Sequence, residues 1–84
     1  MADRSSTMMF SSKAVEREYM KQLLKEVQVA LEDRGYNAVN QLSGYLISGD
    51  PAYISSHMNA RSEIQKVERY EIIEELVRSY LENK

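Results

Sequence analysis

The feature that most constrains the fold is the placement of the residues that break regular backbone structure. All three glycines and the only proline lie in one central segment, residues 35–54. On both sides of it, apolar residues recur at helical spacing with no glycine or proline between them. Because glycine and proline end or redirect helices, this segment must set how the flanking helices meet.

Inside the segment, residues 38–48 predict a short helix with a signal at each end. Asn37 can cap its first turn, because its side-chain oxygen can accept from the free backbone N–H groups there. Gly49 can end the helix at a positive φ. Gly44 lies within it at a cost of about 1 kcal/mol relative to alanine. We therefore expect a close neighbour at Gly44, most simply a second helix that crosses there.

Two further turns flank this short helix. Gly35 follows a polar stretch and suits the positive φ that closes the preceding helix. Asp50 and Pro51 restart the chain as a cap and a first helical position, where the missing N–H of proline costs nothing. These three residues complete the predicted structural motif of the centre.

The flanking stretches predict amphipathic helices whose apolar stripes form the core. The first spans about residues 14–34, and the last spans about 68–82 after a shorter helix that starts near residue 60, with Asn59 as its cap. The stripe expected to form core in the first helix consists of Met20, Leu23, Leu24, Val27, Ala30 and Leu31. In the middle helix Val39, Leu42 and Leu46 share the apolar side, which Tyr45 and Ile47 widen. Ile64 and Val67 are expected to face inward, and the last helix carries one broad apolar face made of Ile72, Ile73, Leu76, Val77, Tyr80 and Leu81.

The stretch 60–82 fits either two helices or one bent helix. Tyr70 stands where a second helix would begin, and its side chain cannot cap, which favours a continuous helix. On such a helix Arg61 and Arg69 would lie within about 80° of each other.

Composition argues against several classes of protein. Eleven basic and thirteen acidic residues give a net charge of −2, whereas nucleic-acid binders normally carry an excess of Lys and Arg. There is no cysteine, and His57 is the only histidine, so a thiolate or histidine metal site and a catalytic triad lack their members. We expect no metal, no cofactor and no enzymatic activity.

No apolar run approaches the roughly 20 residues that a membrane-spanning helix needs, and no stretch resembles a signal peptide. We therefore expect a cytoplasmic protein without membrane insertion.

The predicted fold is all-α, a small bundle of about four to five helices. Residues 14–84 form the helical domain, and residues 1–13 form a flexible regulatory tail that is rich in serine and lacks periodicity. Because a chain of 84 residues buries little surface, we expect a homodimer. The candidate interface residues are Tyr45, Leu46, Ile73, Val77 and Tyr80.

The most basic part of the predicted domain holds four candidate partner-binding residues, His57, Arg61, Lys66 and Arg69. They fit ordinary surface ion pairs with Glu63 and Glu68, or a patch that binds a partner or receives a phosphate. In the tail, Thr7 fits either a spacer or a phosphorylation site.

A resemblance adds to this interpretation. The sequence resembles the IreB/ReoM family of small helical regulators of Gram-positive bacteria over nearly its whole length. The residues that carry it are Gly35-Tyr36-Asn37, Asn40-Gln41, Gly44-Tyr45-Leu46, Ser48-Gly49-Asp50-Pro51-Ala52-Tyr53-Ile54, Asn59-Ala60-Arg61, Glu68-Arg69, Glu71 to Val77, Tyr80-Leu81, and Thr7-Met8 with Phe10.

The resemblance implies that Thr7 is phosphorylated by a membrane-anchored PASTA-type Ser/Thr kinase and dephosphorylated by a cognate phosphatase. The unphosphorylated protein would promote turnover, by the Clp protease system, of UDP-N-acetylglucosamine 1-carboxyvinyltransferase, the first committed enzyme of peptidoglycan precursor synthesis. The chain departs from the family at Ser56 and Gln65, where relatives usually carry arginine, and at Tyr70, where they carry aspartate. The loss of arginine at positions 56 and 65 weakens the basic patch.

Two other functions remain open on the residues alone. Short helices joined by tight turns also fit a helix-turn-helix-like DNA-binding protein. A constitutive dimeric scaffold, indifferent to the state of Thr7, fits as well.

Overall fold

The computed structural model describes residues 12–83, and all of its regular elements are helical. The elements are α2 (Ser12–Asp33), α3 (Ala38–Ser48), the 3₁₀ turns η1 (Pro51–Tyr53) and η2 (His57–Asn59), α4 (Ala60–Ile64) and α5 (Arg69–Glu82). The predicted all-α fold is confirmed for these residues. The first helix begins at Ser12, two positions earlier than predicted, and the rest of the predicted tail, with Thr7, lies outside the described residues.

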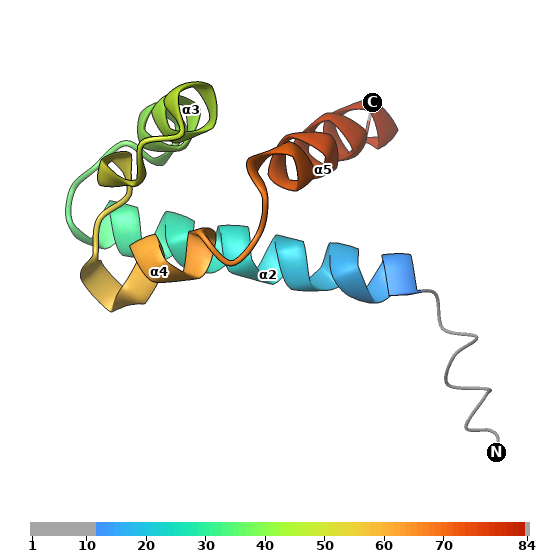
Figure 1. The fold of residues 1–84 in the computed structure, drawn as a ribbon, viewed down its shortest axis with the longest axis horizontal. Coiled ribbons are helices and arrows are strands. Elements are labelled where there is room, and N and C mark those ends of the chain that lie inside the picture. Colours follow the sequence, from blue (N-terminus) through green and yellow to red (C-terminus); the bar gives the residue numbers. More distant parts are fainter. Residues whose placement is uncertain (1–11, 84) are drawn as a thin grey trace, which may run out of the picture.

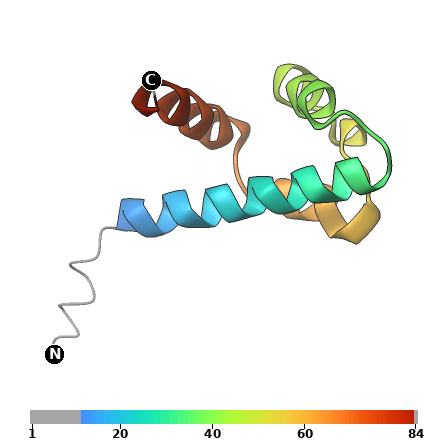
Figure 2. The ribbon, with the colours of Figure 1, turned by 180° about the vertical axis from the view of Figure 1, so that it is seen from behind.

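The long helix α2 is the base on which the other elements are arranged. α3 and α5 lie on one side of it and diverge from each other, whereas α4 lies alongside it (Figure 1). The view from behind shows the same arrangement, with α5 running above the first half of α2 (Figure 2). All three of the other α-helices therefore contact α2, and α3 also packs on η1.

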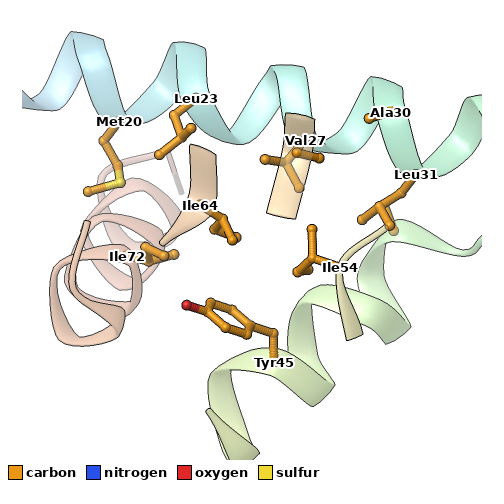
Figure 3. Packing of buried hydrophobic residues seen from close by; sticks show 11 residues of the cluster. Met20, Leu23, Val27, Ala30, Leu31, Tyr45, Ile54, Ile64 and Ile72 are labelled. Atoms are coloured by element: carbon orange, nitrogen blue, oxygen red, sulfur yellow. The ribbon is translucent and has the colours of Figure 1, made fainter. Parts of the chain in front are cut away.

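The core forms where the apolar stripe of α2 meets the other elements. Met20, Leu23, Val27, Ala30 and Leu31 are buried, as their spacing predicted. They face a second set of buried residues, Tyr45, Ile54, Ile64 and Ile72, which come from α3, the η1 end, α4 and α5 (Figure 3).

The predicted inner face of α3 is partly wrong. The side chains of Val39 and Ile47 are 73% and 85% exposed, and Ala38 and Tyr45 are buried instead. Ala38, Leu42 and Tyr45 follow one stripe at spacings of four and three, with Leu42 partly buried. Because α3 rests on its neighbours through this stripe, the two β-branched residues point to solvent.

Of the two arrangements left open for 60–82, two separate helices are observed, and the continuous helix that Tyr70 favoured is not formed. α4 ends at Ile64, and α5 starts at Arg69 behind an extended Glu68. Glu68 and Glu71 form a capping box, in which each side chain accepts from a backbone N–H of the other's turn. Glu68 thus supplies the cap that Tyr70 cannot.

The predicted turn chemistry of the centre is confirmed. The Asn37 side chain accepts from the backbone N–H of Asn40 at 2.9 Å, and Gly49 ends α3 at φ 79°. Gly35 has φ 80°. Asp50 accepts from the N–H of Ala52 at 2.9 Å, with Pro51 as the first residue of η1.

Two details of these turns differ from expectation. The close neighbour of Gly44 is the ring of Tyr53, which a Cβ atom at position 44 would overlap, so a folded-back side chain replaces the expected crossing helix. Asn59 directly precedes α4, but it has φ 61° and its side chain makes no capping hydrogen bond. The predicted cap at Asn59 is therefore wrong.

Candidate functional site

The two arginines of the predicted basic patch hold the backbone of the central segment. Arg61 Nε donates to the carbonyl oxygen of Ile54 at 2.8 Å, and Arg69 Nη1 donates to that of Leu46 at 2.9 Å. Neither pairs with Glu63 or Glu68 as the surface ion-pair interpretation expected. Since α4 and α5 are separate helices, the two arginines also do not share one helical face.

The other two residues of the patch have carboxylate partners. His57 Nε2 lies 2.6 Å from Asp33 Oδ2, which joins η2 to the end of α2. Lys66 Nζ donates to Glu63 Oε2 at 3.0 Å, and this hydrogen bond raises the pKa of Lys66. The lysine side chain is 58% exposed. Of the four, Lys66 is the one whose contact is a simple surface ion pair.

The chain between these contacts is strained. Met58 and Asn59 both have positive φ, 55° and 61°, a conformation that side-chain-bearing residues rarely adopt. The bond from His57 to Asp33 and the bond from Arg61 to Ile54 hold the two sides of this turn. As a result the side chain of Met58 is presented to solvent.

Sequence analysis missed the buried ion pair that joins α2 to α5. Arg17 donates to both carboxylate oxygens of Glu75, at 2.8 Å from Nε and 3.3 Å from Nη2. Ser79 Oγ donates to Glu75 Oε2 at 2.9 Å. Glu75 is 4% exposed and is the one buried charged residue among those described. Glu75 lies three residues after the buried Ile72, on the core-facing side of the same helix. This spacing is the sequence signal that could have identified Glu75 as buried.

This pair shifts the pKa of both partners. The hydrogen bond from Arg17 lowers the pKa of Glu75 against the opposing effect of burial, with Ser79 adding to the lowering. The hydrogen bond to Glu75 raises the pKa of Arg17. Both charged forms are thus favoured in the folded protein.

The lowered pKa predicts a pH dependence of stability. The contribution of Glu75 is complete above its ordinary pKa of about 4.5, and it is lost as the pH falls through the lower folded value. In urea unfolding between pH 7 and pH 3, we expect Glu75→Gln to lose less stability with acid than the wild type does. Glu18→Gln, at an exposed position of α2, should follow the wild-type curve. Parallel curves for the wild type and Glu75→Gln would contradict the assignment.

Three surface hollows surround α5. The α2–α5 cleft is lined by Lys13, Arg17, Met20, Val67, Glu71 and Arg78, among others. The α3–α5 groove is more apolar, with Leu24, Val39, Leu42 and Leu76 beside Lys21 and Lys25. A shallow hollow on the α5 outer face is lined by Tyr70, Ile73, Val77 and Leu81.

The candidate interface residues are divided between core and surface. Tyr45 is only 5% exposed and belongs to the core of the single chain, and Leu46 is partly buried. Ile73, Val77 and Tyr80 are exposed, by 40%, 51% and 74%. The available part of the predicted interface is therefore the α5 outer face.

Within residues 12–83, no group of three or more acidic, histidine or cysteine side chains could hold a metal ion. No helix in the same range is both long enough and apolar enough to cross a membrane.

The fold and its surfaces define a small helical domain whose arginines and histidine hold its elements together, with an apolar helix face left open. The chain belongs to the IreB regulatory phosphoprotein family, whose sequence profile matches residues 5–82. A UPF0297 protein of Acetivibrio thermocellus is 49% identical over 78 residues, which cover 93% of this chain and 87% of the relative. The family resemblance, predicted over nearly the whole chain, is confirmed.

Proposed function

We propose that this protein is a non-enzymatic regulatory adaptor controlled by phosphorylation of Thr7. A PASTA-type Ser/Thr kinase adds the phosphate, and a cognate phosphatase removes it. The observation that carries the proposal is the match to a regulatory phosphoprotein family over residues 5–82, a range that includes Thr7.

In this proposal the unphosphorylated protein promotes Clp-protease turnover of UDP-N-acetylglucosamine 1-carboxyvinyltransferase and so limits peptidoglycan precursor synthesis. Phosphorylation relieves that effect. A phosphate adds about −1.5 to −2 charge, which is large beside the net charge of −2 of the whole chain. One modification can therefore change the electrostatics of a domain this small.

The candidate partner-binding residues remain part of the proposal, but their contacts separate Arg61 and Arg69 from Lys66. Arg61 and Arg69 hold backbone carbonyls, so their removal would disturb the turns as well as any binding surface. Lys66 is mostly exposed and pairs only with Glu63, the residue three positions before it. Lys66→Ala is thus the cleaner probe of target binding.

The second part of the proposal is a homodimer that forms through the α5 outer face. Large exposed apolar patches mark interaction surfaces, and α5 exposes Ile73, Leu76, Val77, Tyr80 and Leu81. A chain of 84 residues gains the buried area it lacks by covering this face with a second copy.

The central experiment replaces Thr7 by alanine in the source organism. We expect the abundance of the carboxyvinyltransferase to fall severalfold, because the unphosphorylated form would persist and continue to direct turnover. Quantitative immunoblotting, with the purified protein mapped by mass spectrometry after incubation with the kinase, checks both steps.

Thr7→Ser is the matched control, since it keeps a hydroxyl that a Ser/Thr kinase can modify, and it should preserve the wild-type abundance. A constitutive scaffold would give the same abundance in Thr7→Ala and Thr7→Glu. That result, or phosphate found only on the tail serines, would sink the proposed function.

A further inference from the structure

The α3–α5 groove contains apolar surface that the single chain leaves uncovered. Val39 of α3 and Leu76 of α5 line it with 73% and 43% exposure, beside the partly buried Leu24 and Leu42. α3 and α5 diverge from each other over α2 (Figure 1), so α2 forms the floor of the groove and the two shorter helices form its walls. The hollow measures about 380 Å³. Apolar side chains gathered in such a hollow are typical of a binding site.

We propose that this groove binds one amphipathic helix of a partner protein, with the apolar side chains of that helix in the groove and its acidic side chains on Lys21 and Lys25. The inference goes beyond the proposed function, because it gives the adaptor a docking surface that does not depend on the state of Thr7.

A helix suits the groove better than an extended segment does. The floor and both walls are helices, whose backbone N–H and C=O groups are paired within each helix, so an extended segment would find no backbone partner there. The floor runs from Lys21 to Gln28, which is about 10.5 Å along the α2 axis. A helix with its side chains is about 10–12 Å wide. The groove therefore has room for one helix.

The charges around the groove favour an acidic partner. Lys21 and Lys25 are exposed and lie four residues apart, on one side of α2. Neither forms an ion pair with another described residue. Glu75 also lines the groove, but Arg17 and Ser79 already bind its carboxylate oxygens. The two lysines are thus the charged groups available to a partner, in a chain whose net charge is −2.

The walls of the groove are held in place within the single chain. The core residue Tyr45 fixes α3, and the Arg17–Glu75 pair fixes the middle of α5. At the first residue of α5, Arg69 donates to the carbonyl oxygen of Leu46 in the last turn of α3. Because these contacts form the groove in advance, binding needs little reorganisation of the protein.

The groove is separate from the proposed homodimer interface. The hollow on the α5 outer face shares no lining residue with the groove. A dimer formed through the outer face therefore leaves the groove open, and one chain can hold a second copy and a partner helix at the same time.

The test measures the binding of a designed helical peptide to the purified, unmodified chain by fluorescence anisotropy. The peptide has about 18 residues, long enough to form a helix in water, with leucines at helical spacing and glutamates one turn apart beside them. A second peptide has lysine in place of each glutamate. We expect the lysine peptide to bind at least about tenfold more weakly, because it sets like charges against Lys21 and Lys25.

Reversing the two lysines should reverse this preference. In Lys21→Glu/Lys25→Glu, the lysine peptide should bind at least about tenfold more tightly than the glutamate peptide. A gain of binding cannot come from unfolding. Lys13→Glu/Arg34→Glu is the matched control, because it changes the net charge equally at two exposed positions outside the groove, and it should keep the wild-type preference.

Two substitutions on α3 test the apolar wall. Val39→Glu places a carboxylate in the groove and should weaken the glutamate peptide at least about tenfold. Ile47→Glu makes the same change at a position that is 85% exposed and outside the groove, and it should bind as wild type does. Since both side chains are mainly exposed, neither substitution opens the core.

A wild-type chain that binds neither peptide, or binds both equally, would overturn the inference, as would equal weakening in Val39→Glu and Ile47→Glu. Light scattering of the chain alone should give the same masses for Val39→Glu as for wild type. A dimer that is lost in Val39→Glu would show that a second copy covers the groove, and would refute the partner helix. Phosphatidylglycerol vesicles that bind where neither peptide does would refute it in favour of a lipid surface.

None of these measurements involves phosphorylation. A kinase that ignores Thr7 would end the proposed function and leave the outcome at the groove to the peptides alone.

Discussion

Ile64→Ala is expected to lower the free energy of unfolding by about 2–5 kcal/mol. Ile64 has no exposed surface and lies at the centre of the core, between the α2 stripe and Ile72 of α5 (Figure 3). Stability is roughly 0.05–0.15 kcal/mol per residue in small domains, so the loss is a large share of the total. Urea unfolding followed by circular dichroism, at one fixed protein concentration, measures it.

The matched control is Ile47→Ala, which deletes the same atoms from a side chain that is 85% exposed. Surface substitutions of this kind change stability by about 0.5 kcal/mol or less, and alanine favours the helix. The difference between the losses of unfolding free energy in the two variants therefore measures the effect of burying the isoleucine side chain. Equal losses would mean that the Ile64 side chain does not occupy the buried position seen against the α2 stripe.

The turns of the centre could be predicted because their causes are local. Asn37, Gly49 and Asp50 act on backbone groups within a few residues, so their neighbours in the sequence are also their neighbours in space. The stripe of α2 could be predicted for a related reason. A 22-residue helix with one apolar side has only one way to bury it.

The errors arose where a choice depended on distant contacts. In α3 several apolar stripes compete, and only the packing of Ala38 and Tyr45 on other elements exposes Val39 and Ile47. The break before α5 contains no glycine or proline. Its signal is a glutamate capping box, which is weaker than the serine or threonine form.

The candidate site shows the same limit. Sequence spacing suggested nearby glutamates as partners for Arg61 and Arg69, whereas both reach backbone carbonyls of the central segment. The Arg17–Glu75 pair spans 58 positions of the chain. Nothing local specifies such a partner, because the pair exists only once α5 has packed on α2.

Val77→Glu is expected to weaken the proposed homodimer by about 100-fold or more in Kd. Val77 is half exposed in the single chain and lies at the middle of the α5 outer face, between Ile73 and Leu81. A second copy that covers this face would bury the new carboxylate without a partner, in both subunits at once. Such burial costs several kcal/mol, and about 2.7 kcal/mol corresponds to a factor of 100. Light scattering across a dilution series measures the change.

Val29→Glu is the matched control, because Val29 is 48% exposed on α2 and lines none of the three hollows around α5. It should keep the wild-type dissociation constant. Since both substitutions place the same charge on a half-exposed helical position, a difference between them reports contact with a second copy rather than a loss of helix. Two variants with equal masses in solution would refute the α5 outer face as the dimer interface. A wild-type chain that stays monomeric would leave that face free for a different protein.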